Sequence, residues 1–163
     1  MEQKEFWRLV ESMGTEPDDD AFGRLADELA TRQAWEILAF EDQLASALYA
    51  LDTRDHARAA RARGDWFLYV RCAAVSSGSS IYQQVLADPK ELRRFARREA
   101  EPLLYVAMKA YERSTGDAWT HESPVSYESG SNVAGWGVVL SASCGPDWAR
   151  VWVSASSGGF RWA

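Results

Sequence analysis

Cysteine and histidine are scarce in this chain of 163 residues, which has two of each. Cys72 and Cys144 are not spaced as a CxxC pair, and His56 and His121 lie far apart in the sequence. Structural zinc needs four convergent ligands, and disulfide scaffolds are dense in paired cysteines. The sequence therefore predicts no metal site and no disulfide framework, and no motif in it requires a cofactor.

Long apolar runs and a secretory pattern are also missing. No stretch approaches the roughly 20 apolar residues that span a membrane. The first residues carry a polar, amphipathic helix pattern instead of a targeting segment. We expect a cytoplasmic protein that folds around one hydrophobic core and does not bind a membrane.

A basic balance is missing as well, because the formal net charge is −6. An acidic chain repels phosphate backbones, so nucleic acid is not an expected partner. Basic side chains dominate only between residues 61 and 113, where Arg93, Arg94, Arg97 and Arg98 crowd together. A solvated helix face explains this cluster most simply, and a site for an anion or an acidic partner is the alternative.

A strong helical pattern occupies residues 65–116. Asp88 and Pro89 predict a helix that begins at Pro89, with the aspartate as N-cap and the proline in the first position. Apolar residues then recur at helical spacing until Gly116, which can end a helix in the left-handed conformation. Pro102 predicts a kink in this run, or two helices that meet there.

The preceding segment begins at Asp65, a candidate cap for a helix so dense in apolar residues that it should be buried on most sides. The SSGSS turn at 76–80 ends that helix, because serine competes for backbone hydrogen bonds and glycine permits positive φ. Residues 54–63 have no strong apolar stripe and predict an exposed helix or a loop.

Three more helices are predicted in the first third of the chain, around residues 6–13, 21–29 and 33–50. The carboxylates of Asp18, Asp19 and Asp20 precede the second of these helices. They are better explained as favourable charge at a helix N-terminus than as metal ligands.

The composition changes after Gly116 to residues rich in Ser, Gly, Val and Trp. The runs 133–142 and 148–155, with 160–162 as a third, predict a small antiparallel β meander. We therefore expect an α+β fold, with a mainly α, multi-helix domain over 1–116 and a β appendage over 117–163. Two short hairpins are unstable alone, so the appendage should pack on the helices or on a partner. Its strand edges would also allow a homodimer.

Several segments resemble a known bacterial family: FLYVR from Phe67, VLADP from Val85 and AYERSTG from Ala110. Over about residues 1–116 the chain is similar to the family catalogued as domain of unknown function 4240. The resemblance implies a mostly helical, cytoplasmic bacterial protein and implies no established activity. Residues 56–64 depart from the family pattern, and so does the Trp-rich tail.

Catalytic motifs are not visible in the sequence: no GxSxG elbow accompanies the serines, and no lysine follows the Ser/Gly turn as in a phosphate-binding loop. One polar group remains, Asp65, Tyr69 and Arg71. A capping aspartate, a core tyrosine and a salt-bridged arginine form the simplest explanation. The alternative is a small anionic-ligand-binding domain or enzyme in which Arg71 binds a carboxylate or phosphate.

Tryptophan is concentrated near the C-terminus. Trp136, Trp148 and Trp152 are candidates for partner binding, because tryptophan combines a large apolar area with one donor and is enriched in interface hot spots. Alternatively, these tryptophan rings cover the helical domain. An acidic, motif-poor protein of this size suits a non-catalytic protein-binding module, of the immunity or regulatory kind, that covers a basic surface. That hypothesis makes a protein the expected partner.

Overall fold

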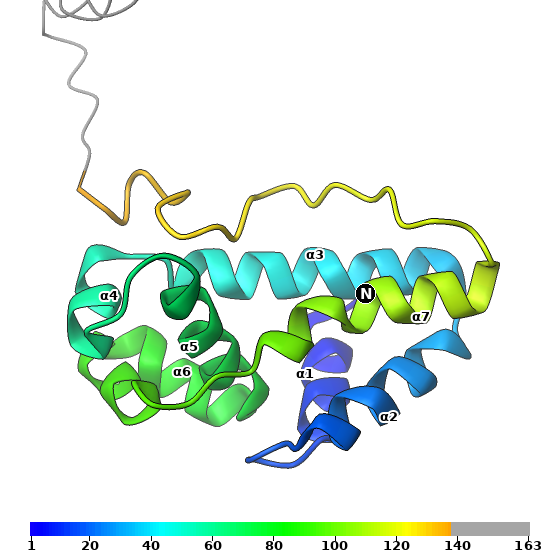
Figure 1. Ribbon diagram of the computed structural model, residues 1–163, viewed down its shortest axis with the longest axis horizontal. Helices are drawn as coiled ribbons and strands as arrows, with labels where there is room; N and C mark the ends of the chain where they lie inside the picture. The colour runs from blue at the N-terminus through cyan, green and yellow to red at the C-terminus, as the bar shows by residue number, and fades with distance from the viewer. Residues whose placement is uncertain (138–163) are drawn as a thin grey trace, which may run out of the picture.

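The computed structural model describes residues 1–137 of the chain. Its elements are α1 (Gln3–Glu11), α2 (Asp19–Ala30), α3 (Ala34–Ala50), α4 (Arg54–Ala60), α5 (Gly64–Ser76), α6 (Ser79–Ala87), the 3₁₀ helices η1 (Pro89–Phe95) and η2 (Glu101–Tyr105), and α7 (Val106–Thr115). α3 and α7 run side by side along the molecule, while α4, α5 and α6 gather at one end (Figure 1).

Local signals place several helix ends where the sequence predicts them. Asp18 caps α2, since its Oδ1 accepts a hydrogen bond from the Ala21 amide at 2.8 Å. Gly78, with φ of 95°, separates α5 from α6, and Gly116, with φ of 77°, ends α7. These predictions are confirmed because each depends only on residues within about one turn.

The core is centred on α3 and α5. Every residue from 70 to 76 is buried, which confirms the prediction that α5 is covered on most sides. The neighbours of α5 are α3, α6, η1 and η2, so apolar side chains on all its faces find partners. None of the helices in residues 1–137 has the length and apolar character needed to cross a membrane.

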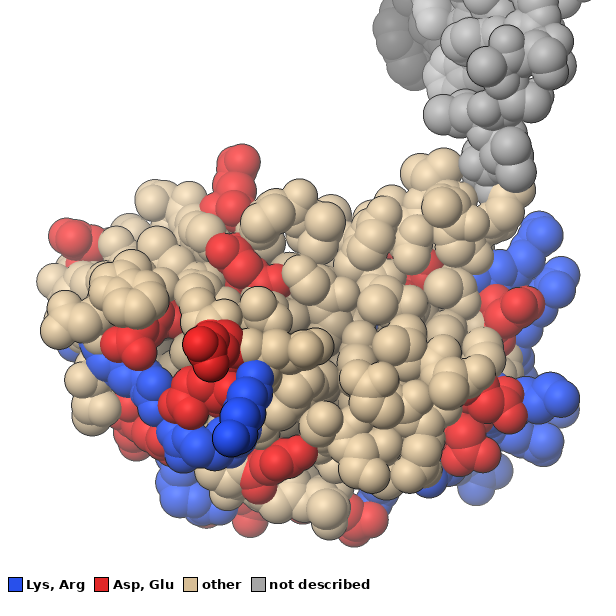
Figure 2. Space-filling model, turned by 180° about the vertical axis from the view of Figure 1, so that it is seen from behind, with Lys and Arg blue, Asp and Glu red and all other residues tan. Residues whose placement is uncertain are grey.

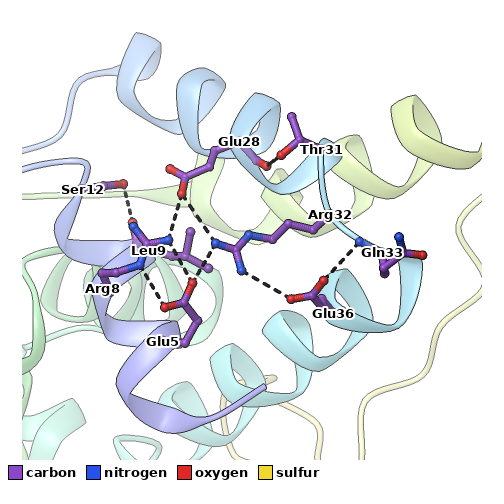
Figure 3. Close-up of polar contacts among 9 residues, drawn as sticks. All are labelled: Glu5, Arg8, Leu9, Ser12, Glu28, Thr31, Arg32, Gln33 and Glu36. Carbon is purple, nitrogen blue, oxygen red and sulfur yellow. Dashed lines mark hydrogen bonds and ion pairs between the residues drawn. The ribbon is translucent and has the colours of Figure 1, made fainter.

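An ion-pair network ties the N-terminal helices together on the surface (Figure 3). Arg32, in the turn between α2 and α3, reaches Glu5 at 2.7 Å, Glu36 at 3.5 Å and Glu28 at 3.8 Å. Arg8 of α1 also binds Glu5 at 2.9 Å. Hydrogen bonds from Arg8 and Arg32 lower the pKa of Glu5 to about 2. Positive charge at this end of the molecule is therefore matched by carboxylates.

The segment after Asp88 is not the long helix that the sequence predicts. It begins at Pro89 as expected, and the Asp88 side chain accepts from the Lys90 amide at 3.0 Å. However, the first two turns are 3₁₀, the chain leaves helical conformation at 96–100, and α7 proper begins only at Val106. Pro102 explains the break, because it has no amide N–H to bond the carbonyl four residues earlier and its ring crowds that carbonyl, so a new helix starts at Glu101 instead. The alternative of separate helices meeting near Pro102 is the correct one.

The expectation for residues 54–63 is half right. Arg54–Ala60 is helical, but His56, Ala57 and Ala60 are buried against η1 and the rest of the core. His56 lies between the Thr53 hydroxyl, 2.7 Å from Nδ1, and the Val85 carbonyl, 3.0 Å from Nε2. Small alanines give no strong apolar stripe in the sequence, yet they allow close packing.

The predicted α+β class is wrong for the described chain, which is mainly helical and contains no β-strand within residues 1–137. The start of the first predicted strand, 133–137, forms turns, because the Trp136 amide binds the Asn132 carbonyl at 3.1 Å. The other predicted strand residues, 138–142, 148–155 and 160–162, lie outside the described residues. Local turns and contacts with the helices, rather than hydrogen bonds to a neighbouring strand, satisfy the backbone N–H and C=O groups here.

Residues 117–137, which we call the strap, run back along α3 after α7 (Figure 1). From Trp119 to Ser129 the odd-numbered residues are half-buried and the even-numbered ones exposed. This period of two is that of an extended chain. Between Trp119 and Ser129 the strap therefore lies on the helices as an extended segment.

Candidate functional site

Asp52, in the turn after α3, holds the end of the strap. Its side chain is 0% exposed. It accepts hydrogen bonds from the Gly130 amide at 3.0 Å, the Asn132 amide at 2.9 Å and the Trp136 indole Nε1 at 2.9 Å. A buried carboxylate is costly unless several donors surround it. The strap supplies these donors.

Arg71 of α5 holds the middle of the strap. It is also 0% exposed, and its Nη1 donates to the Leu48 carbonyl at 2.8 Å. Its Nη2 donates to the Tyr127 carbonyl at 2.9 Å and to the Ser129 hydroxyl at 3.1 Å. Its guanidinium carbon lies 4.6 Å from the centre of the Phe67 ring. Desolvation lowers the pKa of Arg71, and the charge of Asp52 opposes this effect.

The structure does not bring Asp65, Tyr69 and Arg71 together. Successive residues of a helix turn by about 100°, so Asp65 and Tyr69 share a face while Arg71 points to nearly the opposite side from Tyr69. Asp65 is exposed, in the first turn of α5, and makes no side-chain cap. Desolvation, then the charges of Glu101 and Asp65, raise the pKa of Tyr69. Arg71 instead faces α3 and the strap.

Titratable groups cluster beneath the first half of the strap. Glu41 of α3 is 5% exposed, and burial raises the pKa of its carboxyl to about 7. Its Oε2 has no hydrogen-bond partner among the described residues. Beside it, His121 of the strap lies 2.7 Å from Asp42. His121 is therefore held by a contact between its Nε2 and the Asp42 carboxylate of α3.

Unpaired arginines gather at the end of the molecule formed by α4 and η1. We call this surface the arginine face and define it by the exposed side chains Arg54, Arg58, Arg61, Arg63, Arg93 and Arg97. None of these has an ion-pair partner within residues 1–137, whereas every other exposed arginine of that range does: Arg8, Arg24, Arg94, Arg98 and Arg113. Figure 2 shows basic side chains projecting along this edge of the molecule.

Two hollows lie within the arginine face. One, of about 680 Å³, opens between α4 and the strap and is lined by Arg54, Arg58, Arg61, Arg63, Ser129, Gly130 and Trp136 among others. The other, of about 400 Å³, lies between α4 and η1 and is bordered by Arg61, Arg93, Arg94 and Arg97. Arg61 borders both. It is also the only non-glycine residue with positive φ (53°) in the described chain.

Comparison with known families identifies the helical part of the chain. A family model described as "Protein of unknown function (DUF4240)" matches residues 1–113. The chain belongs to this family. The predicted resemblance is thereby confirmed. Comparisons with curated proteins and with solved structures found no match.

The family domain, residues 1–113, contains Glu41, Asp52 and Arg71, while the strap that covers them lies outside the matched region. Sequence reasoning missed Asp52 and Glu41 altogether. An isolated Asp after a helix has no local signal for burial, because its donors come from residues about 80 positions later. The sequence indicated two of the six residues of the arginine face, Arg93 and Arg97, as part of a basic cluster, but it did not indicate that the arginines of α4 and its following turn join them.

The remaining site predictions have these positions. Trp136 is half-buried in the strap and its ring centre lies 6.1 Å from that of Phe67, edge to face. Trp148 and Trp152 lie outside the described residues. Within residues 1–137, no group of three or more histidine, cysteine, aspartate or glutamate side chains is arranged to hold a metal ion.

Proposed function

We propose that this DUF4240 domain is a non-catalytic, cytoplasmic protein-binding module, of the immunity or regulatory kind, and that it binds an acidic segment of its partner on the arginine face. One observation carries the proposal. The exposed arginines that have no carboxylate partner within residues 1–137 all belong to α4, η1 and the turns that follow these two neighbouring elements.

Arginine suits such a surface because its planar guanidinium binds a carboxylate through two parallel hydrogen bonds. At the opposite end of the molecule, Arg8 already binds Glu5 in this way, through its Nε and Nη2 at 2.9 Å each. On the arginine face the corresponding donors are directed to solvent. A partner that supplies carboxylates would form there the ion pairs that the domain itself supplies elsewhere.

The shape and net charge of the molecule favour a protein segment over a nucleic acid. The arginines surround hollows of about 680 Å³ and about 400 Å³, with Trp136 in one wall, instead of following a continuous groove. The net charge of −6 weakens the long-range attraction on which phosphate-backbone binding depends. The partner segment proposed is thus acidic, in contrast to the basic surface that the composition first suggested.

Backbone strain at Arg61 also supports a binding role for this face. A residue with a side chain in the left-handed conformation costs roughly 1–2 kcal/mol relative to glycine at the same position. Such strain concentrates at functional sites. Glycine would end α4 more favourably than arginine. We therefore infer that the Arg61 side chain has a role other than ending the helix.

The test is affinity capture from lysate of the source cell with the full chain as bait, followed by mass spectrometry of captured proteins and small molecules. The bait is compared with Arg58→Gln/Arg61→Gln. A matched control is Lys4→Gln/Arg24→Gln, which removes the same charge from exposed positions on α1 and α2.

We expect a protein partner to be captured by wild type and control, to be lost with the arginine-face variant, and to elute with salt. A partner retained equally by all three baits would contradict the proposal for the arginine face. Capture of only nucleic acid or a metabolite would contradict the protein-binding function.

A further inference from the structure

The helical domain buries three charged side chains that all face the strap. Arg71 and Asp52 are 0% exposed and Glu41 is 5% exposed. Charged residues are rarely buried this completely unless they are paired or serve a function. In contrast, no residue of the strap is buried to this degree, because residues 117–137 are all half-buried or exposed. The buried charged groups are therefore part of the helical domain, and the strap lies over them.

The domain binds the strap largely through main-chain atoms. Arg71 donates to the carbonyl of Tyr127, and Asp52 accepts from the amides of Gly130 and Asn132. These contacts are charge-assisted and lie in a partly buried setting, where hydrogen bonds are strong. Contacts of this type recognise an extended backbone with little dependence on the side chains that point to solvent.

A few strap side chains add sequence requirements. The Ser129 hydroxyl accepts from Arg71 at 3.1 Å and donates to the Gly64 carbonyl at 2.8 Å. The Asn132 side-chain amide donates to the Tyr49 carbonyl at 3.1 Å, and the Trp136 indole donates to Asp52. Gly130 adopts φ of 96°, which favours glycine. The surface thus fits the pattern Ser-Gly-x-Asn-x-x-x-Trp in an extended or turn-forming segment.

All of the recognising residues, Tyr49, Asp52, Gly64 and Arg71, lie within the region matched by the family, and the recognised segment lies after it. We infer that this surface is a peptide-binding site of the helical domain, and that the strap is an intramolecular ligand that a segment of the same pattern can replace. The ligand class is a protein segment with the Ser-Gly-x-Asn-x-x-x-Trp pattern. The contacts behind this inference involve none of the arginines of the arginine face, although Ser129, Gly130 and Trp136 also line its larger hollow.

The weak apolar anchoring of the strap makes exchange feasible. Its hydrophobic contacts with the core come from partly buried Trp119, Tyr127 and Trp136. Segments held by a few polar contacts and half-buried aromatics open locally without unfolding of the whole domain. A strap with a fully buried apolar face would not be expected to do so.

The test uses the full chain with a protease recognition sequence inserted between Gly116 and Asp117, both exposed. The protein is folded first and then cleaved, so that the strap stays in place without a covalent link. A fluorescent synthetic peptide of residues 117–137 is added, and its exchange into the site is followed by fluorescence anisotropy. We expect saturable binding to the cleaved protein and much slower binding to the uncleaved one, where the linked strap competes.

Backbone-modified peptides make the test specific without altering the protein. N-methylation of Gly130 or Asn132 removes a donor to Asp52 and should weaken binding at least about tenfold, the effect of one lost charge-assisted hydrogen bond. N-methylation of Ser126, whose amide has no hydrogen-bond partner among the described residues, is the control and should have little effect. In the protein, the Asp52→Asn substitution should weaken binding of the unmodified peptide.

Failure of the peptide to bind cleaved protein that remains helical by circular dichroism would overturn the inference. Equal binding of all N-methylated peptides would also overturn it, because main-chain recognition by Asp52 would then be absent. Loss of helical structure on cleavage alone would show that the strap is an integral part of the fold and would equally overturn it.

Discussion

Replacing Glu41 by glutamine should remove a pH-dependent loss of stability that wild type undergoes between about pH 5 and pH 8. Glu41 is 5% exposed beneath the strap, and its pKa is raised from 4.5 to about 7. Burial is the main cause, the charge of His121 opposes it, and the charge of Asp42 adds to it. The folded protein therefore favours the protonated carboxyl.

The sign and size of the effect depend on the two pKa values. A carboxyl whose pKa is higher in the folded state contributes most below its unfolded pKa, and this contribution is lost as pH rises through the folded pKa. The rise from 4.5 to about 7 corresponds to roughly 3 kcal/mol in total. Between pH 5 and pH 8 the expected loss is about 2.5 kcal/mol.

The assay is urea denaturation at intervals of pH, followed by tryptophan fluorescence, with wild type and Glu41→Gln in parallel. The quantity of interest is the difference between the two free energies of unfolding at each pH. Titrating groups that do not interact with Glu41 cancel in this difference. One of them is His56, whose pKa is lowered by desolvation and whose contribution is instead lost as pH falls below about 6.5.

We expect the variant to gain about 2.5 kcal/mol relative to wild type from pH 5 to pH 8. Glu122→Gln, at an exposed position of the strap, is the control for the loss of one carboxylate. Parallel curves for wild type and Glu41→Gln would refute the reasoning. Such a result would mean that water reaches Glu41 or that the strap does not cover it in solution.

Three further predictions concern backbone strain and thiol burial. Arg61→Gly should raise the free energy of unfolding by about 1 kcal/mol, since φ is 53° there, and should weaken partner capture; reduced stability would contradict the strain argument. Gly78→Ala should cost about 1–3 kcal/mol, because φ is 95° and the new Cβ would lie 3.2 Å from Glu11. The matched change Gly23→Ala in α2, with nothing within 4 Å, should be neutral or stabilising in the same denaturation assay. In a Cys144→Ser background, Cys72 should react with a thiol reagent at pH 8 only after unfolding, because burial raises its pKa to about 12; rapid reaction of folded protein would exclude that burial.

The sequence predicted helix ends well and helix continuity poorly. Asp18 and Gly116 act through hydrogen bonds to residues within four positions, so their effect is written in the local sequence. The run after Pro89 has helical spacing throughout, yet its first turns are 3₁₀ and the chain then leaves helical conformation. Its packing against α4 and α5 involves residues distant in sequence, and the periodicity of a single segment carries no information about such contacts.

Residues 117–137 also show that a local sequence pattern does not determine tertiary contacts. The sequence predicts a strand that begins at residue 133, yet residues 133–137 form turns. Half-buried and exposed residues alternate instead between Trp119 and Ser129, where an extended segment lies on helices and no strand was predicted. Period-two patterns report an extended backbone and say nothing about which groups satisfy its hydrogen bonds. In the described part of the strap, those groups include Arg71 and Asp52.

By itself, therefore, the sequence determined the helical character of residues 1–116, the capped ends of several helices and membership of the DUF4240 family. Only the tertiary structure decided that Arg71 faces away from Tyr69, that Asp52 is buried and that arginines of α4 and η1 form one face. The physical reason is the distance along the chain between the residues that interact. Caps and periodicities involve neighbours within about two turns, whereas burial and charge convergence are set by elements that meet only when the whole chain has folded.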